Sequence, residues 1–352
     1  MEDRNDMPIT ENDEIRIQII GYKSQGESIV VTIGNQEYGY NKFAGIIDCF
    51  KVGRNFITKK ILKENNIKKL DFICWTHPDW DHTYGLSELE SYIGENTRFA
   101  LPQGTTDRQL EEILNEKQKV TKYTKEYGKI FSMIKKIKKC NIVHANHSST
   151  LYTFRMLCCE KSFKFHMCSF APISSIVTEL SNQGIIKLYQ HVKGDEDFSV
   201  EDLMNKKNNL YSMGIRITLT DEQSKETLAF CMCGDLDNMT IEAMDGSKAK
   251  GYMGNNTIFK IPHHSSKNAN LIISKGYISR AEYAVTTGYK MGRNDLPDKE
   301  VLKQYKRIIR PTGKVIRTDY IKEDTYGIAE FRYNIYKLIL SEFKPIKAAG
   351  EY

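Results

Sequence analysis

The sequence predicts a layered α/β fold, and two patterns of apolar residues carry this prediction. Apolar side chains recur at helical spacing over residues 55–69, and the near-continuous apolar run of residues 70–76 follows directly. A run of that kind is typical of a strand buried on both faces of a sheet. Further β-branched runs occur in both halves of the chain with helical segments between them. We therefore expect sheets covered by helices.

In the first half, β-branched runs predict strands at residues 15–20 and 28–33, with a glycine-containing turn between them. Residues 45–48 predict a third strand. Residues 106–139 predict one or two helices, because an apolar stripe recurs there at helical spacing. This segment is also the most basic part of the chain. Its lysines form either an ordinary solvated face or a surface for nucleic-acid phosphates.

The second half is also rich in predicted strands. Residues 192–208 are polar and acidic and predict a loop, and residues 297–309 predict a helix with a proline near its start. Residues 330–340 fit either a strand or a helix. The remaining β-type runs are residues 151–176, 213–220, 226–235, 257–262, 281–288 and 314–319.

Length and composition limit the classes of protein that fit. The chain has 352 residues, which at about 150 residues per domain allows roughly two domains or one large one. No apolar run is long enough to span a membrane, and the first residues lack the apolar core of a secretory signal. The eight cysteines include several inside apolar runs and form no CxxC pair. We therefore expect reduced thiols and a cytoplasmic location.

The strongest candidate site is the sequence HPDWDH, at the end of the apolar run of residues 70–76. It places His77, Asp79, Asp81 and His82 within six residues, and only eight histidines occur in the chain. Neutral imidazoles and carboxylates are ligands for divalent metals. The spacing lets His77 and Asp79 turn toward one cation, and Asp81 and His82 toward a second. The alternative is a polar turn with an incidental His–Asp pair.

Two further clusters follow predicted strands in the second half. Asp235 ends an apolar run and follows a glycine, so it either bridges two cations or belongs to an ordinary Gly-Asp turn. His263 and His264 follow the run at residues 257–262. We expect one of them, His263, as a metal ligand, and the other as an outer contact or acid catalyst. Lys260 either lies on the surface or faces an anionic substrate.

The order of these motifs resembles the metallo-β-lactamase fold superfamily. The series is an SxGE turn before a strand, then IID, HxDxDH, GD and KxPHHxS. More narrowly, it is similar to the soluble hydrolase domain of ComEC-type DNA-uptake proteins, which carry HxDxDH rather than HxHxDH. The resemblance runs over about residues 14–320. It implies a four-layer αββα sandwich, here with a lysine-rich helical insertion near residues 103–140.

The resemblance also implies a metal centre. The resemblance implies that one or two cations are held by His77, Asp79, Asp81, His82, Asp235 and His263. Two cations would lie about 3.5–4 Å apart and clamp a hydroxide between them. Asp235 would bridge, and Asp81 would both bind metal and orient the nucleophile. His264 or Ser265 would supply a proton, with Asp48 and Lys260 in supporting roles. Three carboxylates shift the expected metal from Zn²⁺ toward Mn²⁺ or Mg²⁺.

Four departures from the family pattern bear on this expectation. The family's HHGS is HHSS, so Ser265 replaces a glycine, and Cys49 stands where a glycine follows the IID aspartate. A late His-Pro is Leu296-Pro297 in this chain. The middle metal-ligand histidine has no clear counterpart, since neither His166 nor residues 169–172 fit. Two alternatives therefore remain: a site that holds one metal ion, and a site whose metal binds only with substrate.

We expect a metal-dependent hydrolase, foremost a phosphodiesterase or nuclease acting on DNA or RNA. The motif variant, the basic helical segment and the net charge of +6 support this expectation. One alternative is hydrolysis of a small substrate such as a cyclic nucleotide, thioester or lactam. Another is a degenerate metal site that serves as a binding or regulatory module.

The motif order favours one domain over two. The first cluster lies in a front half of about residues 14–190, and Asp235 and His263 lie in a back half of about residues 205–345. A shared metal centre needs both halves. We therefore expect residues 1–352 to form a single domain that carries the basic insertion.

Overall fold

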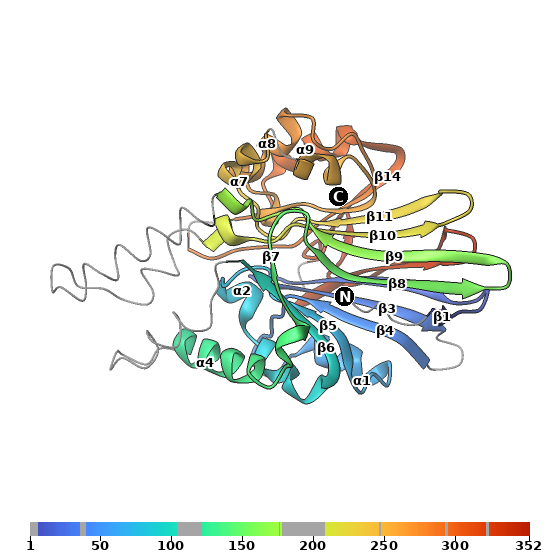
Figure 1. The fold of residues 1–352 in the computed structure, drawn as a ribbon. Coiled ribbons are helices and arrows are strands. Elements are labelled where there is room, and N and C mark those ends of the chain that lie inside the picture. The colour runs from blue at the N-terminus through green and yellow to red at the C-terminus, as the bar shows by residue number, and fades with distance from the viewer. Residues whose placement is uncertain are drawn as a thin grey trace.

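The computed structural model describes most of the chain and shows an α/β protein with two mixed sheets (Figure 1). The described residues are 6–35, 40–103, 122–175, 177, 208–245, 248–292, 295–321 and 324–352. The α/β prediction is therefore confirmed. The predicted loop at residues 192–208 lies outside the described residues except for its last residue, and most of the predicted insertion before residue 122 also lies outside them. Within the described ranges, no helix is long and apolar enough to cross a membrane.

One sheet has eight strands in the order β16-β15-β2-β3-β4-β5-β6-β7. The strands from β16 to β4 pair antiparallel, and those from β4 to β7 pair parallel. The last two long strands of the chain thus join the sheet of the first half. Residues 330–340 form the end of β15, a turn and the start of β16, so they are neither a single strand nor a helix. The bounds are β2 (Glu14–Tyr22), β3 (Glu27–Asn35), β4 (Tyr40–Ile47), β5 (Leu70–Cys74), β6 (Ile93–Pro102), β7 (Ile142–Ala145), β15 (Tyr326–Asn334) and β16 (Ile339–Lys347).

The other sheet has nine strands in the order β1-β8-β9-β10-β11-β12-β13-β14-β17. Its central strands from β8 to β11 are antiparallel, and those from β11 to β14 are parallel. The run predicted at residues 151–176 contains a hairpin of two strands, β8 and β9, which ends at Ser169. The bounds are β1 (Met7–Pro8), β8 (Thr150–Cys158), β9 (Lys161–Ser169), β10 (Ile215–Asp221), β11 (Thr227–Met232), β12 (Asn255–Lys260), β13 (Arg280–Thr286), β14 (Ile309–Arg317) and β17 (Gly350–Glu351).

The two sheets face each other across a shared apolar core. Phe43 of β4 lies 5.2 Å from Phe165 of β9 between ring centroids, and both side chains are buried. The same continuous cluster includes alternate residues of β2 and β10, as expected where one face of each strand points inward. Burial of this apolar surface is the main stabilising contribution to the packing of the two sheets.

Helices cover the outer faces of both sheets (Figure 1). Those on the nine-stranded sheet are α7 (Asn238–Ala243), α8 (Leu271–Ser274) and α9 (Lys299–Ile308). Those on the eight-stranded sheet are α1 (Ile57–Glu64) and α4 (Lys122–Ile134), with the short 3-10 segment η1 (Leu86–Tyr92). The predicted helix at residues 297–309 begins two residues later, because the Asp298 carboxylate accepts the amide hydrogens of Glu300 and Val301.

The described part of the basic segment is a docked helix. The predicted apolar stripe is buried from Tyr127 to Ile137 and packs in the same cluster as Trp75. Lys136 pairs with Glu90, and Lys138 Nζ lies 2.6 Å from Glu95. Part of the positive charge on this segment is therefore balanced by nearby acids. The predicted stripe residue Val120 and the lysines before residue 122 lie outside the described ranges.

Candidate metal centre

The predicted motifs meet where the parallel strands of both sheets end. The loop after β5 leads into α2 (Trp80–Thr83), and the loops after β11 and β12 carry Asp235 and η5 (His263–Ser265). The carboxyl ends of parallel strands are where sites gather in α/β folds. A backbone hydrogen bond of 3.0 Å from Met213 N to Thr76 O joins the two sheets at this edge.

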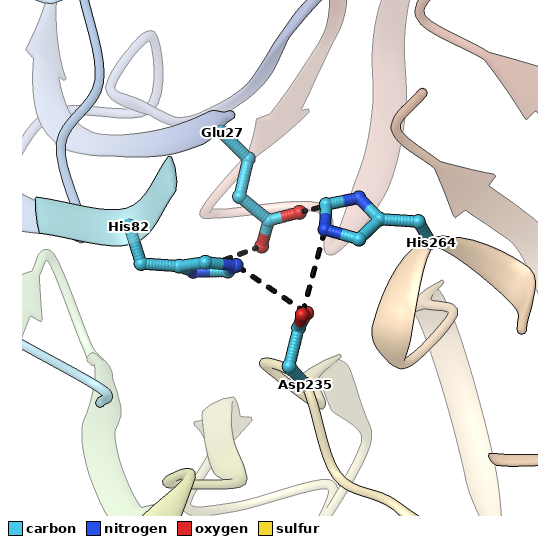
Figure 2. Close-up of side chains that lie close together, drawn as sticks. All are labelled: Glu27, His82, Asp235 and His264. Carbon is cyan, nitrogen blue, oxygen red and sulfur yellow. Dashed lines mark ion pairs between the residues drawn. The ribbon is translucent and has the colours of Figure 1, made fainter. Parts of the chain in front are cut away.

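Four buried side chains form the centre of the site (Figure 2). His82 Nε2 lies 3.3 Å from Asp235 Oδ1, and His264 Nε2 lies 3.4 Å from Asp235 Oδ2. Asp81 Oδ2 is 3.2 Å from His264 Nε2 and 3.7 Å from His82 Nε2. Glu27, at the start of β3, approaches both imidazoles from their other side. The two imidazoles therefore lie among three carboxylates, with Glu27 on the Nδ1 side and Asp81 and Asp235 on the Nε2 side.

Asp48 holds the front loop in place from behind. Its carboxylate accepts the Thr76 amide at 2.7 Å and the Thr76 hydroxyl at 2.5 Å, and it lies 2.7 Å from His82 Nδ1. Because a carboxylate only accepts, His82 Nδ1 is the donor. The single hydrogen of the Thr76 hydroxyl is donated in the hydrogen bond to Asp48, so the hydroxyl oxygen accepts a hydrogen bond from His77 Nδ1 at 2.9 Å. Both imidazoles therefore leave Nε2 without a proton when neutral.

Unpartnered buried atoms mark the place where a cation fits. His77 Nε2, His82 Nε2 and Asp235 Oδ1 are buried and lack a hydrogen-bond partner. Leaving such groups unpaired in the interior costs free energy unless a ligand satisfies them. Nitrogen and carboxylate donors of this kind suit a divalent metal. The residues present therefore fit a metal ion.

The backbone at the site is held in unusual conformations. His263, His264 and Ser265 have φ values of 48°, 51° and 63°, each costing about 1–3 kcal/mol for a non-glycine residue. Gly234, directly before Asp235, also has a positive φ of 51°, and a Cβ there would lie 2.6 Å from Ser212 Oγ. This explains why a glycine precedes the aspartate.

The structure changes the expected placement of the two adjacent histidines. His264, not His263, reaches Asp81 and Asp235, because the left-handed turn directs the second imidazole inward. His263 lies at the rim, where its Nε2 is 3.5 Å from Asn209 Nδ2. Ser265 donates its hydroxyl to Thr286 at 2.8 Å. Among the described residues, no hydrogen bond joins Ser265 to the carboxylates of the centre, so its predicted proton-donating role lacks geometric support.

The other predicted residues occupy distinct places. His77 is fully buried, whereas the Asp79 side chain is one-third exposed and its Oδ2 lies 3.6 Å from His77 Nε2. Lys260 is neither on the surface nor facing an open cavity, since it is fully buried with Nζ 2.7 Å from Glu27 Oε2. His166 lies in the middle of β9, paired with Thr218 of β10, and so is not the missing middle ligand at the strand ends.

Charge–charge contacts shift the pKa values of the central groups. Burial opposes protonation of His264, but Asp235, Asp81 and Glu27 overcome it and raise its pKa to about 9. The pKa of His82 is likewise raised well above its usual value, mainly by Asp235, despite burial. Burial disfavours the Asp235 carboxylate, yet the two imidazoles hold its pKa well below the ordinary value. Burial instead lowers the pKa of His263, which favours its neutral form.

These shifts predict how metal binding depends on pH. Without metal, His264 and His82 carry protons at pH 7, and a cation must displace them. The apparent affinity for Zn²⁺ or Mn²⁺ should therefore rise as pH increases toward 9, with release of protons at pH 7. Calorimetric titration in two buffers of different ionisation enthalpy measures that release. Binding at pH 7 without proton uptake by either buffer would contradict this assignment.

Two residues of the centre were not singled out from the sequence. Glu27 begins a strand whose residues are all buried, and a carboxylate in such a position is a usable signal, since buried acids are normally paired. Thr287 follows β13 and contacts both His264 Nδ1 and Glu27 Oε2. Nothing in the local sequence distinguishes it from its neighbour Thr286.

Comparisons with known proteins add no assignment: no family model matches this sequence, and no curated protein matches it. The chemistry of the site therefore follows from its own geometry.

Proposed function

We propose that this chain is a divalent-metal-dependent hydrolase with a four-layer αββα sandwich of the metallo-β-lactamase type. One observation carries the proposal. His77 and His82 have Nδ1 bound from behind and an unpartnered Nε2, beside the unpartnered Asp235 Oδ1. Imidazoles oriented in this way by outer carboxylates are typical of metal-binding histidines. The motif order and the two facing sheets support the same family.

The candidate ligands form two groups, one with four protein ligands for a metal ion and one with fewer. Asp81, His82, Asp235 and His264 would hold one ion. His77 and Asp79 would hold a second ion together with Asp235, with fewer protein ligands. The mixture of two imidazoles and two carboxylates in the group of four suits Zn²⁺ or Mn²⁺, with Mg²⁺ as a harder alternative.

A bound divalent ion supplies a Lewis acid and lowers the pKa of water toward neutrality. Asp81 lies where its carboxylate can accept a proton from the attacking water. Asp235 lies between His82 and His264 and fixes their spacing. The proton that Asp81 accepts would then pass to the leaving oxygen. Burial lowers the pKa of His263 and favours its neutral form, so His263 is suited to accepting a hydrogen bond rather than to giving that proton.

We favour a phosphodiester of DNA or RNA as substrate. The net charge of +6 favours an anionic substrate, and the Tyr127 hydroxyl of α4 donates to the Pro78 carbonyl within the HPDWDH loop. Lys125 and Lys129 lie exposed on the same face of α4. The basic helix therefore borders the loop that carries His77 and Asp79.

Metal analysis and substrate assays test the proposal. The purified chain should contain or take up Zn²⁺ or Mn²⁺, and it should hydrolyse DNA, RNA or a cyclic nucleotide when these ions are titrated in. A protein that binds metal but cleaves no phosphodiester would sink the phosphodiesterase proposal. A protein that binds no metal would sink the hydrolase proposal as well and leave a binding or regulatory module.

A charge-neutralising variant separates a long substrate from a small one. Lys125→Gln/Lys129→Gln should weaken nucleic-acid cleavage, because each lost phosphate contact reduces the slope of log affinity against log salt by about one. Hydrolysis of a cyclic nucleotide should stay unchanged. The matched control is Lys299→Gln/Lys303→Gln on α9, which covers the other sheet. Equal effects of both double variants on nucleic acid would contradict a specific role for α4 and leave the small-substrate hydrolase ahead.

A further inference from the structure

A chain of buried polar contacts runs behind His264. Thr287 Oγ1 lies 2.8 Å from His264 Nδ1 and donates its proton to Glu27 Oε2 at 2.7 Å. Lys260 Nζ lies 2.7 Å from the same Glu27 oxygen. Each of these residues is at most 1% exposed. The four residues come from β3, β12 and the segments after β12 and β13, so the chain of contacts joins both sheets.

The hydroxyl of Thr287 determines which nitrogen of His264 holds the proton. A hydroxyl has one hydrogen, and Thr287 gives it to an acceptor-only carboxylate. The contact of 2.8 Å to His264 Nδ1 therefore requires that Nδ1 be the donor. Neutral His264 then presents the lone pair of Nε2 to Asp81 and Asp235.

Glu27 acts behind the imidazoles rather than among the metal ligands. Its oxygens lie 3.8 Å from His82 Nδ1 and 3.9 Å from His264 Nδ1. The Nε2 atoms of the same rings face Asp235 on the opposite side. Figure 2 shows Glu27 and Asp235 on opposite sides of the two imidazoles. One oxygen of Glu27 is also already shared by Lys260 and Thr287.

Lys260 couples this arrangement to the loop that carries Asp235. Its Nζ donates to the Gly234 carbonyl at 3.3 Å, one residue before Asp235. It also compensates the negative charge of Glu27 in a site that holds several other carboxylates. The front half of the site has an analogous arrangement, in which Asp48 holds His77 through the hydroxyl of Thr76.

We infer that Glu27, Thr287 and Lys260 form a positioning relay that holds His264 with Nε2 directed at a divalent cation. The relay residues act through His264 and do not touch the ion. This inference rests on the metal-dependent function proposed above. It predicts that the hydroxyl of Thr287, and not its volume, determines affinity for the cation.

The test compares four full-length proteins by calorimetric titration with Zn²⁺ and with Mn²⁺. Thr287→Val keeps the shape but removes the hydroxyl, and should lower affinity about 10–100-fold, the effect typical of an outer contact to a metal-binding histidine. Thr287→Ser keeps the hydroxyl and should restore affinity to near that of the wild type. Thr318→Val is the matched control, because Thr318 Oγ1 is buried beside Thr287 and has no hydrogen-bond partner.

Each outcome separates the relay from the proposed function. Wild type that binds neither ion overturns both. Wild type that binds metal, with Thr287→Val unchanged or Thr287→Ser equally weakened, overturns the relay alone. Long-range ¹H–¹⁵N NMR of the Zn²⁺-loaded wild type tests the relay without any variant. It should show His264 bound through Nε2 with a proton on Nδ1, and binding through Nδ1 would overturn the relay even if Thr287→Val fails to fold.

Discussion

Asp235→Asn should abolish metal-dependent hydrolysis and reduce affinity for Zn²⁺ or Mn²⁺ by more than the roughly 100-fold expected for loss of an outer contact. Asp235 faces both His82 and His264, and its Oδ1 is the unpartnered oxygen of the centre. The asparagine keeps the size of the side chain but replaces one anionic oxygen with an amide that has hydrogens. The amide nitrogen carries hydrogens and is a poor ligand for a cation, so the variant would offer one oxygen ligand where Asp235 offers two.

The measurement is metal content and affinity of the full-length variant, followed by hydrolysis of the best wild-type substrate. Asp237→Asn is the matched control, because Asp237 lies two residues away and caps α7 through the Thr240 amide rather than facing the centre. It should keep wild-type affinity. An Asp235→Asn protein that binds both ions as wild type does would contradict the metal centre.

The sequence identified the position of the site better than the roles within it. The HPDWDH segment could be predicted as a site because it follows a buried strand, and the ends of parallel strands in α/β folds meet at one edge. The sequence did not show which of His263 and His264 points toward the metal centre. Three successive residues with positive φ set the direction of the two imidazoles. A turn of this kind is normally predicted from glycine, and none of the three residues is glycine.

Long-range contacts account for most of what the sequence did not reveal. Glu27 and Thr287 are 260 residues apart and meet only because β3 begins and β13 ends at the same edge of the two sheets. The pairing of β15 with β2 similarly joins the end of the chain to its first long strand. Local periodicity predicts that a segment is a strand, but it carries no information about which distant strand will be its neighbour.

The burial of Lys260 illustrates the same point. As the first residue of KxPHHxS, Lys260 fitted either a surface position or a contact with substrate, since lysines are rarely fully buried. In the folded protein its ammonium group is enclosed and paired with Glu27. Burial alone would lower the pKa of Lys260, yet Glu27 and Asp235 raise it above the ordinary value. The charge is thus retained inside the fold, where only its partners make it tolerable.

Removal of Glu27 should therefore be among the most destabilising single changes in the chain. Glu27→Ala leaves the Lys260 ammonium buried without its carboxylate, which should lower the free energy of unfolding by about 3–5 kcal/mol. Glu27→Ala/Lys260→Met removes both charges and should recover most of that loss, because no unpaired charge remains and the methionine fills the space of the lysine stem. Chemical denaturation in the presence of a chelator measures both variants without a contribution from bound metal.

The exposed pair of Glu300 and Lys303 on α9 provides the control for this comparison. Both side chains are more than half exposed, so water already screens their interaction. Glu300→Ala should leave the unfolding midpoint almost unchanged. The expected role of the buried pair would be contradicted if Glu27→Ala lowered the free energy of unfolding no more than Glu300→Ala does. It would also be contradicted if the double variant were less stable than Glu27→Ala. Recovery by the double variant would instead show that the unpaired ammonium, not the lost contacts of Glu27, causes the instability.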